Sequence, residues 1–352
     1  MKGKKKASPQ KKALIALVSV LAVVFALLLA ATVYVEWVLG RFYYDPSQDG
    51  TMSLQDAQAL LQDDQGNTID PNMEVVNPDD IQLGQVGKVN VSEHVLNILL
   101  VGQDRREGEK ERTRSDTMIL VTINKKAKQV TLTSFMRDLY VQIPGYYKNR
   151  LNVAYRLGGA ELLFDTLEYN FGIRPDHFVE VDFSGFRKVV DMVGGIDMEL
   201  TQKEANHLNN NEDFYDFPKE NWSLKEGLNH LNGKQALAYA RIRKIDATGD
   251  FARTDRQRKV VTSLIDKTKT MNVLEINSLV LTVSDIISTD MTANEIMGYV
   301  AELAPLLDDM NEVDGVQIPA EGKYKMAGVE GVGSVLIPDL PGNSQVIAEY
   351  QK

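Results

Sequence analysis

A near-continuous apolar run, Val95-Leu96-Asn97-Ile98-Leu99-Leu100-Val101, limits the folds that this chain can adopt. A strand that is apolar at successive positions is buried on both faces, whereas a strand with one solvated face alternates apolar and polar residues. The sheet that contains this run is therefore expected to be covered on both sides. Two further strands are predicted at Met118–Asn124 and Gln129–Phe135, joined as a hairpin across residues 125–128.

Strand patterns and helix patterns then alternate along the chain. Residues 203–230 are polar and predicted to be irregular. The alternation indicates an α/β sandwich with a mixed sheet. The predicted strands are His177–Asp182, Ile196–Leu200, Val316–Ile318 and Ser334–Ile337, and the predicted helices are Gly158 to about Asn170, Phe183–Met192, Gly233–Ala240, Asp255–Thr270, Val273–Ile287 and Ala293–Leu307.

The N-terminus predicts a membrane anchor. Six lysines within residues 1–12 precede an uncharged apolar run, Ala13–Val35. At about 1.5 Å per residue this run matches a hydrocarbon core roughly 30 Å thick. A cleaved signal peptide is the alternative, but its apolar region is usually only about 7–15 residues long. We expect a cytoplasmic tail at 1–12, a single transmembrane helix at 13–36, a stalk at 37–90 and an extracytoplasmic domain at 91–352, because lysines precede the span.

The charge distribution excludes one class of function. Residues 1–40 contain six lysines and one glutamate, a balance of +5, whereas the whole chain carries −10, so residues 41–352 carry −15. Affinity for nucleic acid depends on neutralising phosphates with basic residues, so no nucleic-acid partner is expected. The chain contains no cysteine, and its four histidines are too widely spaced to form a metal-ligand pattern.

Arginines and aspartates gather in short strings at the ends of the apolar segments. Guanidinium groups bind phosphate oxygens in a two-pronged geometry, and carboxylates hold Mg²⁺ against the same oxygens. An arginine-rich pocket in an acidic protein is therefore a candidate pyrophosphate site. The strings are Gly102-Gln103-Asp104, Arg112-Thr113-Arg114-Ser115-Asp116, Arg137-Asp138, Arg241-Ile242-Arg243 and Arg253-Thr254-Asp255-Arg256.

Seven strings in one order, between about residues 95 and 262, resemble the LytR–CpsA–Psr family. A single string would be a weak signal, but seven co-linear ones are specific. They are Asn97–Asp104, Arg114–Met118, Ser134–Asp138, Leu151–Tyr155 before Gly158-Gly159, Val190–Ile196, Leu231–Arg243 and Asp250–Gln257.

The resemblance implies a three-layer α/β/α enzyme. It would transfer a glycopolymer, such as teichoic acid or capsular polysaccharide, from a polyprenyl-pyrophosphate carrier to peptidoglycan. The bond formed would be a phosphodiester, commonly at the muramic acid O6. Asp104 and Asp116 would hold Mg²⁺ (or Mn²⁺). Positive charge around the pyrophosphate would come from Arg114, Arg137, Arg241, Arg243, Arg253 and Arg256, together with Gln257.

The catalytic assignments leave the general base open. Asp104 and Asp138 are both candidates, with Arg137, Arg241 and Arg243 stabilising the transition state, but an aspartate bound to Mg²⁺ is a poor base. The polyprenyl chain also needs an apolar groove. Five residues could line it, although packing of a helix face in the core is the favoured explanation for them: Leu162, Leu163, Leu167, Val189 and Val190.

Two other functions remain compatible with the sequence. Water in place of the sugar hydroxyl would make the protein a pyrophosphatase that acts on the lipid-linked glycan. A non-catalytic receptor or regulator would bind the lipid-linked glycan without turnover, although pure binding has little use for paired aspartates. The two are distinguished by product analysis with and without an acceptor, and by the effect of Asp116→Ala on envelope composition.

Overall fold

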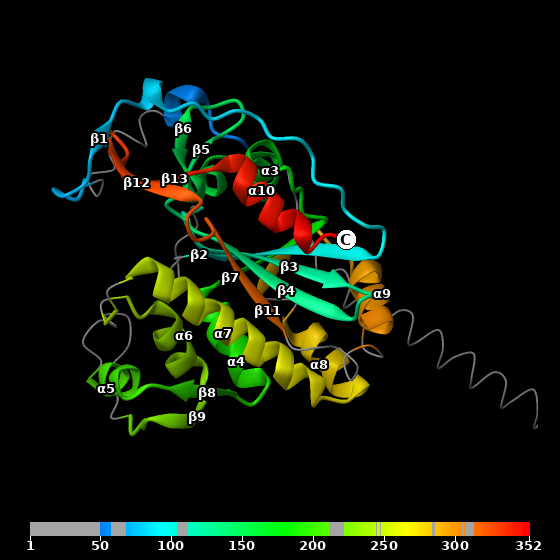
Figure 1. Cartoon of the computed structure of the whole chain (residues 1–352). Helices are drawn as coiled ribbons and strands as arrows, with labels where there is room; N and C mark the ends of the chain where they lie inside the picture. Colours follow the sequence, from blue (N-terminus) through cyan, green and yellow to red (C-terminus); the bar gives the residue numbers. More distant parts are fainter. Residues whose placement is uncertain are drawn as a thin grey trace, which may run out of the picture.

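The computed structural model describes residues 50–57, 68–103, 112–210, 222–243, 245–246, 248–283, 286–303, 306 and 313–352. Its centre is a six-stranded mixed sheet with the strand order β10 (Ile287–Thr289), β7 (His177–Asp182), β2 (Val95–Gln103), β3 (Ser115–Asn124), β4 (Gln129–Phe135) and β11 (Asp314–Ile318). Helices α3 (Leu151–Phe171) and α10 (Leu340–Glu349) lie on one side of the sheet; on the other lie α4 (Phe183–Met192), α6 (Gly233–Arg241), α7 (Asp250–Lys269) and α8 (Val273–Val283) (Figure 1).

The sheet is mixed because two of its five pairings are parallel. Strand β2 runs parallel to β7 and β4 runs parallel to β11, whereas the other three pairings are antiparallel. Strand β2 is buried on both faces. Leu99 and Val101 belong to the core under α3, while Leu96 packs in the separate core on the other side of the sheet. The predicted α/β class and mixed sheet are confirmed.

Two helices begin earlier than the sequence predicts. Helix α3 begins at Leu151, and Gly158 and Gly159 form a kink inside it rather than its start. Gly159 has a φ of 64°, a conformation that glycine adopts at no steric cost. Helix α7 begins at Asp250 instead of Asp255, which places Asp250 and Arg253 in its first turn.

The region 203–230, predicted to be irregular, contains regular structure. Helix α5 (Gln202–Asn210) buries Ala205 and Leu208, and β9 (Gly227–Leu231) pairs antiparallel with β8 (Ile196–Leu200). The prediction was wrong because the pairing partner of β9 lies far back in the sequence, so its stability comes from a contact that local polarity does not reveal. The predicted helix to Ile287 likewise ends at Val283, before β10.

Residues 68–90, expected as part of a stalk, lie against the domain instead. The Val86 amide donates to the Tyr169 carbonyl at 3.1 Å, and the Val89 amide donates to the Gly172 carbonyl at 2.8 Å. Strand β1 (Val75–Val76) pairs with β12 (Tyr324–Val329), which pairs in turn with β13 (Gly333–Pro338). This segment is held by main-chain hydrogen bonds. Its side chains can therefore be polar, and that polarity suggested a stalk. The remaining elements are η2 (Pro78–Asp80), β5 (Tyr140–Gln142), β6 (Lys148–Arg150) and α9 (Ala293–Leu303).

A buried polar network joins the first central strand to the C-terminal residues. Asn97 on β2 donates its amide to the Gln351 side chain at 2.8 Å and accepts from the Thr122 hydroxyl at 2.8 Å. The Gln351 amide donates to the same hydroxyl at 3.2 Å. All three side chains are buried, and each gives the others a hydrogen-bond partner. Without these partners, removing their polar atoms from water would be costly.

The predicted transmembrane helix at 13–36 and the tail at 1–12 lie outside the described residues. Among the helices that the structure does describe, none combines the length and the apolar character that a membrane span requires.

Candidate active site

The predicted arginine–aspartate cluster forms where β3, β4 and the first turn of α7 meet. Arg137, just after β4, lies at its centre. Its Nη1 contacts Asp116 Oδ1 at 2.7 Å, its Nη2 contacts Asp250 Oδ2 at 3.4 Å, and its Nε contacts Asp138 Oδ2 at 3.4 Å. Arg243 reaches Asp250 with its Nε at 2.5 Å. Segments that are more than a hundred residues apart in the chain thus supply one charged site.

The carboxylates change the protonation behaviour of the cluster. Burial alone would lower the pKa of Arg137, but Asp116, Asp138 and Asp250 outweigh burial and raise it. Burial raises the pKa of the Asp138 carboxyl, with Arg137 opposing that rise and Asp250 adding to it. Burial would also raise the pKa of Asp250, but neighbouring arginines lower it. The two carboxyls therefore differ: Asp250 is held as an anion, while Asp138 is poised to take a proton.

At two further arginines the nearby carboxylates do not outweigh burial and the neighbouring guanidinium groups. Burial, and then the charges of Arg150, Arg156 and Arg137, lower the pKa of Arg114 to about 10. Burial and the charge of Arg137 also lower the pKa of Arg253, whose Nε has no hydrogen-bond partner among the residues that the structure describes. Guanidinium groups that are buried beside one another are stabilised when an anion joins them. The cluster therefore has the electrostatics of an anion site.

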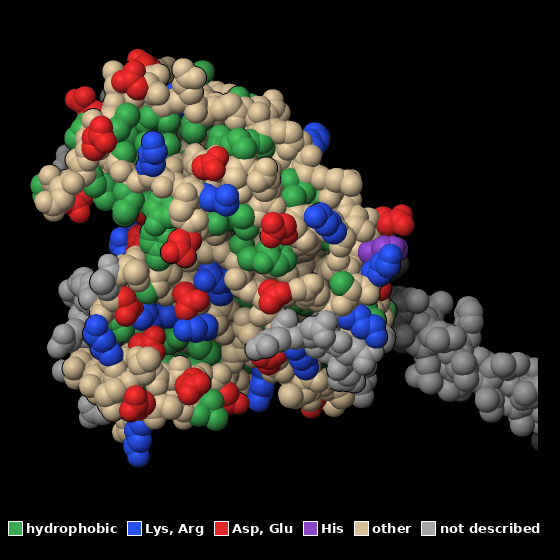
Figure 2. Space-filling view, viewed as in Figure 1, with side chains coloured by type: hydrophobic (Ala, Val, Ile, Leu, Met, Phe, Trp, Pro, Cys, Tyr) green, Lys and Arg blue, Asp and Glu red, His purple; other side chains and the backbone are tan. Residues whose placement is uncertain are grey.

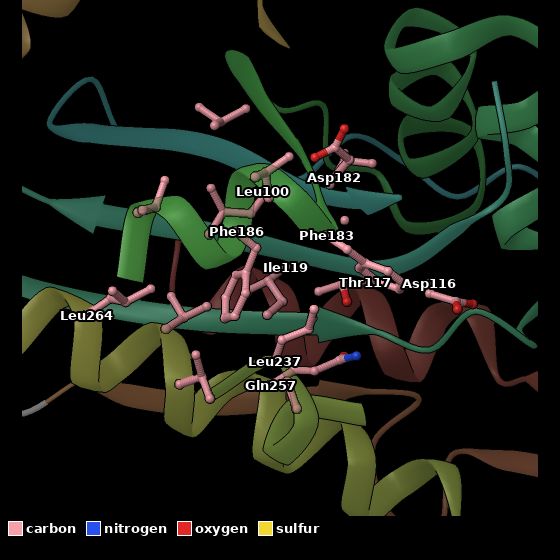
Figure 3. Close-up of a pocket in the computed structure, with 18 of the residues that line it drawn as sticks. Leu100, Asp116, Thr117, Ile119, Asp182, Phe183, Phe186, Leu237, Gln257 and Leu264 are labelled. Carbon is pink, nitrogen blue, oxygen red and sulfur yellow. The ribbon is translucent and has the colours of Figure 1, made fainter. Parts of the chain in front are cut away.

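A largely apolar cavity of about 560 Å³ opens beside the cluster, between the sheet and the helices α4, α6, α7 and α8. Figure 3 shows its two ends. Asp116, Thr117 and Asp182 lie at one end, and Leu264 and Phe186 lie toward the other. Arg241, at the polar end, lies with its Cζ 4.5 Å from the ring centroid of Phe183, a cation–π contact that fixes the guanidinium at the wall. The cavity can hold a molecule with a charged head and a long apolar tail.

The structure brings most of the predicted site residues to this cavity. The residues that line it are Asp116, Arg137, Arg241, Arg243, Arg253 and Gln257. Arg114 belongs to the same charged neighbourhood through its interaction with Arg137 and Asp116. Asp138 contacts Arg137 directly. Asp104, predicted as a metal ligand and candidate base, lies outside the described residues.

Arg256 is not brought to the cluster. Its Nε contacts Glu204 Oε1 at 2.8 Å, its Nη2 contacts Asp246, and its Nη1 donates to the Ile242 carbonyl at 3.3 Å. These partners use the guanidinium fully, and its side chain is only 6% exposed. Arg256 therefore fastens α5 and the segment after α6 to α7, which corrects its predicted role in binding pyrophosphate.

The expected groove residues also separate. Val189 lines the cavity, whereas Leu162, Leu163 and Leu167 are buried in the core under α3. Val190 packs in the core that joins α4 to α6 and β8. Most of the groove is built from residues that the sequence did not single out, such as Leu264, Leu279 and Val283.

Sequence reasoning missed two charged members of the cluster. Asp250 contacts Arg137, Arg243 and Arg253, and Arg150 Nη1 lies 3.6 Å from Asp138 Oδ1. Asp250 stands first in a string already recognised, Asp250–Gln257, so the string contained the signal. Arg150 stands immediately before Leu151, at the helix start that was predicted too late.

The donor set suits a hard cation only in part. Among the described residues there is no group of three or more acidic, histidine or cysteine side chains that could enclose a metal ion. Mg²⁺ commonly binds through only one or two carboxylates, with phosphate oxygens and water completing its shell. Asp116, an oxygen donor in the wall of the cavity, fits that arrangement.

Comparisons with known proteins identify the family of this chain. The model of the LytR_cpsA_psr family matches residues 60–338. The chain is 35% identical over 257 residues to the polyisoprenyl-teichoic acid–peptidoglycan teichoic acid transferase TagU of Enterococcus faecalis, covering 72% of this chain and 76% of that protein. It is 30% identical over 276 residues to the regulatory protein MsrR of Staphylococcus aureus, covering 77% and 79%.

The fold also has a solved counterpart. The structure of TagT bound to LIIa-WTA aligns with a TM-score of 0.60 and 25% identity, covering 76% of this chain and 94% of that one. The seven strings lie inside the segment matched by the family model, and the predicted arginine site forms within it. This chain therefore belongs to the LytR–CpsA–Psr family.

Proposed function

We propose that this protein is a membrane-anchored phosphotransferase that moves a glycopolymer from a polyprenyl-pyrophosphate carrier onto peptidoglycan, with its catalytic domain outside the membrane. One observation carries the proposal: a cluster of arginines, in which burial and neighbouring guanidinium groups outweigh the carboxylates at Arg114 and Arg253, lies at the mouth of an apolar cavity. A lipid pyrophosphate has the matching shape, an anionic head on an apolar tail. The name of TagU, a transferase of teichoic acid to peptidoglycan, supports the same reaction class.

The donor is bound by complementary surfaces. The polyprenyl chain lies along Ile119, Phe186 and Leu264, and the pyrophosphate lies over Arg137, Arg253 and Gln257. Fixed positive charge stabilises the charge that develops on the phosphoryl oxygens, and a single such donor is commonly worth about 10²–10³ in rate.

The reaction is a phosphoryl substitution. The acceptor hydroxyl, proposed as the muramic acid O6, forms a bond to the phosphorus that bears the glycan. The bond from that phosphorus to the bridging oxygen breaks, and polyprenyl phosphate leaves with the electron pair. The hydroxyl proton passes to a carboxylate, for which Asp138 is the candidate, because it contacts Arg137 and burial raises its pKa.

A divalent cation belongs to the proposal as well. Asp116, with Asp104, would hold Mg²⁺ or Mn²⁺ at the edge of the cavity. The ion would supply charge neutralisation of the pyrophosphate.

The test uses the full-length protein in detergent with a short-chain polyprenyl-pyrophosphate glycan, Mg²⁺ and peptidoglycan oligomers. Mass spectrometry measures the conjugate, free glycan phosphate and polyprenyl phosphate. Arg137→Ala is expected to lower conjugate formation by about 10²–10³. Arg174→Ala is the matched control, because Arg174 pairs with Glu161 and Asp165 on the outer surface of α3, away from the cavity.

Two results would reject the transferase, and a third would reject the proposed site. Equal amounts of glycan phosphate with and without acceptor, and no conjugate, would indicate a pyrophosphatase. Donor binding without any product would indicate a non-catalytic receptor or regulator; MsrR is named a regulatory protein. A conjugate that forms equally well with Arg137→Ala would reject the proposed site.

A further inference from the structure

A second, smaller pocket of about 390 Å³ adjoins the charged cluster. Its walls come from β12, β13, the turn after β4 and the start of α7, and include Met136, Asp138, Phe251 and Met326. Figure 2 shows charged side chains gathered in the hollow between the part of the molecule that carries β12 and β13 and the part that carries α6 and α7. No step of the donor binding described above uses this pocket.

The two pockets meet at the cluster rather than being separate sites. Arg243 lines both of them. Arg137 lines the larger cavity with Asp116, while its Nε and Nη2 reach Asp138 and Asp250, which line the smaller pocket. A phosphoryl group bound to Arg137 and Arg243 would therefore have the apolar cavity on one side and the smaller pocket on the other.

The walls of the smaller pocket suit a sugar. A sugar ring has apolar C–H faces and a rim of hydroxyl groups. Phe251, whose ring lies 5.4 Å from that of Tyr324, offers an apolar wall together with Met326. Asp138 and Asp250 are acceptors for hydroxyl protons. Met326 is 54% exposed, so this apolar wall is open to solvent and accessible to a large molecule.

The stereochemistry of phosphoryl transfer gives the pocket a role. The attacking and leaving oxygens lie roughly in line on opposite sides of the phosphorus. When the leaving polyprenyl phosphate occupies the apolar cavity, the attacking hydroxyl must arrive from the opposite side. The smaller pocket lies there, and it contains Asp138, which contacts Arg137 and whose pKa burial raises.

We propose that the smaller pocket is the acceptor site, in which Phe251 and Met326 hold a saccharide while Asp138 takes the proton from its attacking hydroxyl. This inference rests on the transferase activity proposed above and adds the location of its second substrate. The new P–O bond forms from the pocket side, the bond to the bridging oxygen breaks on the cavity side, and the proton resides on Asp138 until solvent removes it.

The experiment blocks the pocket without touching the cluster. Met326→Trp fills the open wall, and Lys325→Trp is the matched control, because Lys325 is the adjacent exposed residue of β12 and does not line the pocket. Full-length proteins are assayed at varied peptidoglycan oligomer and varied donor concentrations. Met326→Trp is expected to raise the KM for the oligomer at least about tenfold while the KM for the donor changes less than about twofold. Lys325→Trp is expected to change neither.

Equal oligomer KM values for Met326→Trp and wild type, or a parallel rise in donor KM, would overturn the proposal. Calorimetric binding of the oligomer to the same three proteins decides the matter without turnover. Binding that Met326→Trp weakens supports the acceptor site even if wild type forms no conjugate, a result that would reject only the transferase. Absence of oligomer binding to wild type, or equal binding to Met326→Trp, rejects the acceptor site.

The pH profile tests the proton acceptor. Since the pKa of Asp138 is raised, the rate is expected to fall on acidification at a higher pH than for an ordinary aspartate, whose pKa is about 3.9. In Asp138→Asn this acid limb should disappear along with most of the rate. An unchanged acid limb in Asp138→Asn would assign the proton to another group.

Discussion

Two sides of helix α7 use the same residue type for opposite purposes. Arg253, Gln257, Val260 and Leu264 line the apolar cavity, at the spacing i, i+4, i+7 and i+11 that keeps one helical face together. Arg256 lies roughly 60° around the helix from Arg253, at about 100° per residue, and pairs with Glu204 and Asp246. The string Arg253-Thr254-Asp255-Arg256 shows that this helix carries arginines, but the helical period determines which of them faces the cavity.

The two arginines also differ in how their charge is balanced. Arg256 has two carboxylates and a carbonyl around it, and these raise its pKa despite burial. Arg253 has one carboxylate, Asp250, 3.4 Å away, and burial together with the charge of Arg137 lowers its pKa. Removing one partner of a balanced buried pair destabilises the fold, whereas an unbalanced buried charge is stabilised when an anion binds beside it.

The largest effect is expected on stability, from Arg256→Met. Glu204 would remain buried without its partner, which costs about 3–5 kcal/mol in the free energy of unfolding. Urea unfolding followed by circular dichroism measures this change, and the double variant Arg256→Met/Glu204→Gln should recover part of it. Activity per folded molecule should stay within about twofold of wild type. A stable Arg256→Met protein with lost activity would return Arg256 to the pyrophosphate site.

The next effect is expected on catalysis, from Arg253→Met. Loss of one preorganised donor is expected to lower kcat/KM for the donor by about 10²–10³, because Arg253 lines the cavity beside Arg137. The midpoint of urea unfolding should change little, since removing one of two buried like charges offsets the loss of its contact with Asp250. A strongly destabilised but fully active Arg253→Met would erase the difference between the two sides of α7.

The smallest effect is expected from Gln257→Leu, one turn further along the same side. A hydrogen bond from the Gln257 amide to the charged pyrophosphate contributes about 1.5–3 kcal/mol, so the KM for the donor should rise roughly ten- to a hundredfold with stability unchanged. Steady-state kinetics at saturating acceptor measures it. An identical change in a variant of the neighbouring surface position, Lys259→Leu, would show that the effect does not come from the cavity wall.

Much of the architecture follows from local sequence. The bounds of β4, β7, β8 and α4 agree with those predicted, because buried runs, turn glycines and the Asp182 cap act within a few residues. Strand β9 and the segment 68–90 escaped prediction because their stabilising hydrogen bonds go to distant partners. The polarity of the side chains in a segment does not indicate which distant main-chain groups that segment pairs with.

In the site, too, local sequence predicted some features, whereas contacts between distant residues could not be predicted. Asp116, Arg137 and Arg243 stand at the ends of predicted elements, so the topology of the sheet brings them together as expected. The role of Arg256 could not be inferred, because Glu204 belongs to a helix that the polar sequence concealed. The apolar cavity also escaped prediction, since its lining residues look the same in sequence as ordinary core residues.

The hydrogen bond between Asn97 and Gln351 has a consequence for how the protein comes to be folded. The bond closes a separation of 254 residues, and it satisfies a polar side chain buried in the first central strand. Until residue 351 packs against β2, the Asn97 side chain lacks its Gln351 partner. Contacts of such long sequence separation form slowly, so this buried polar network is expected to form late in folding. The last residues of the printed chain therefore help to complete the interior of the central sheet.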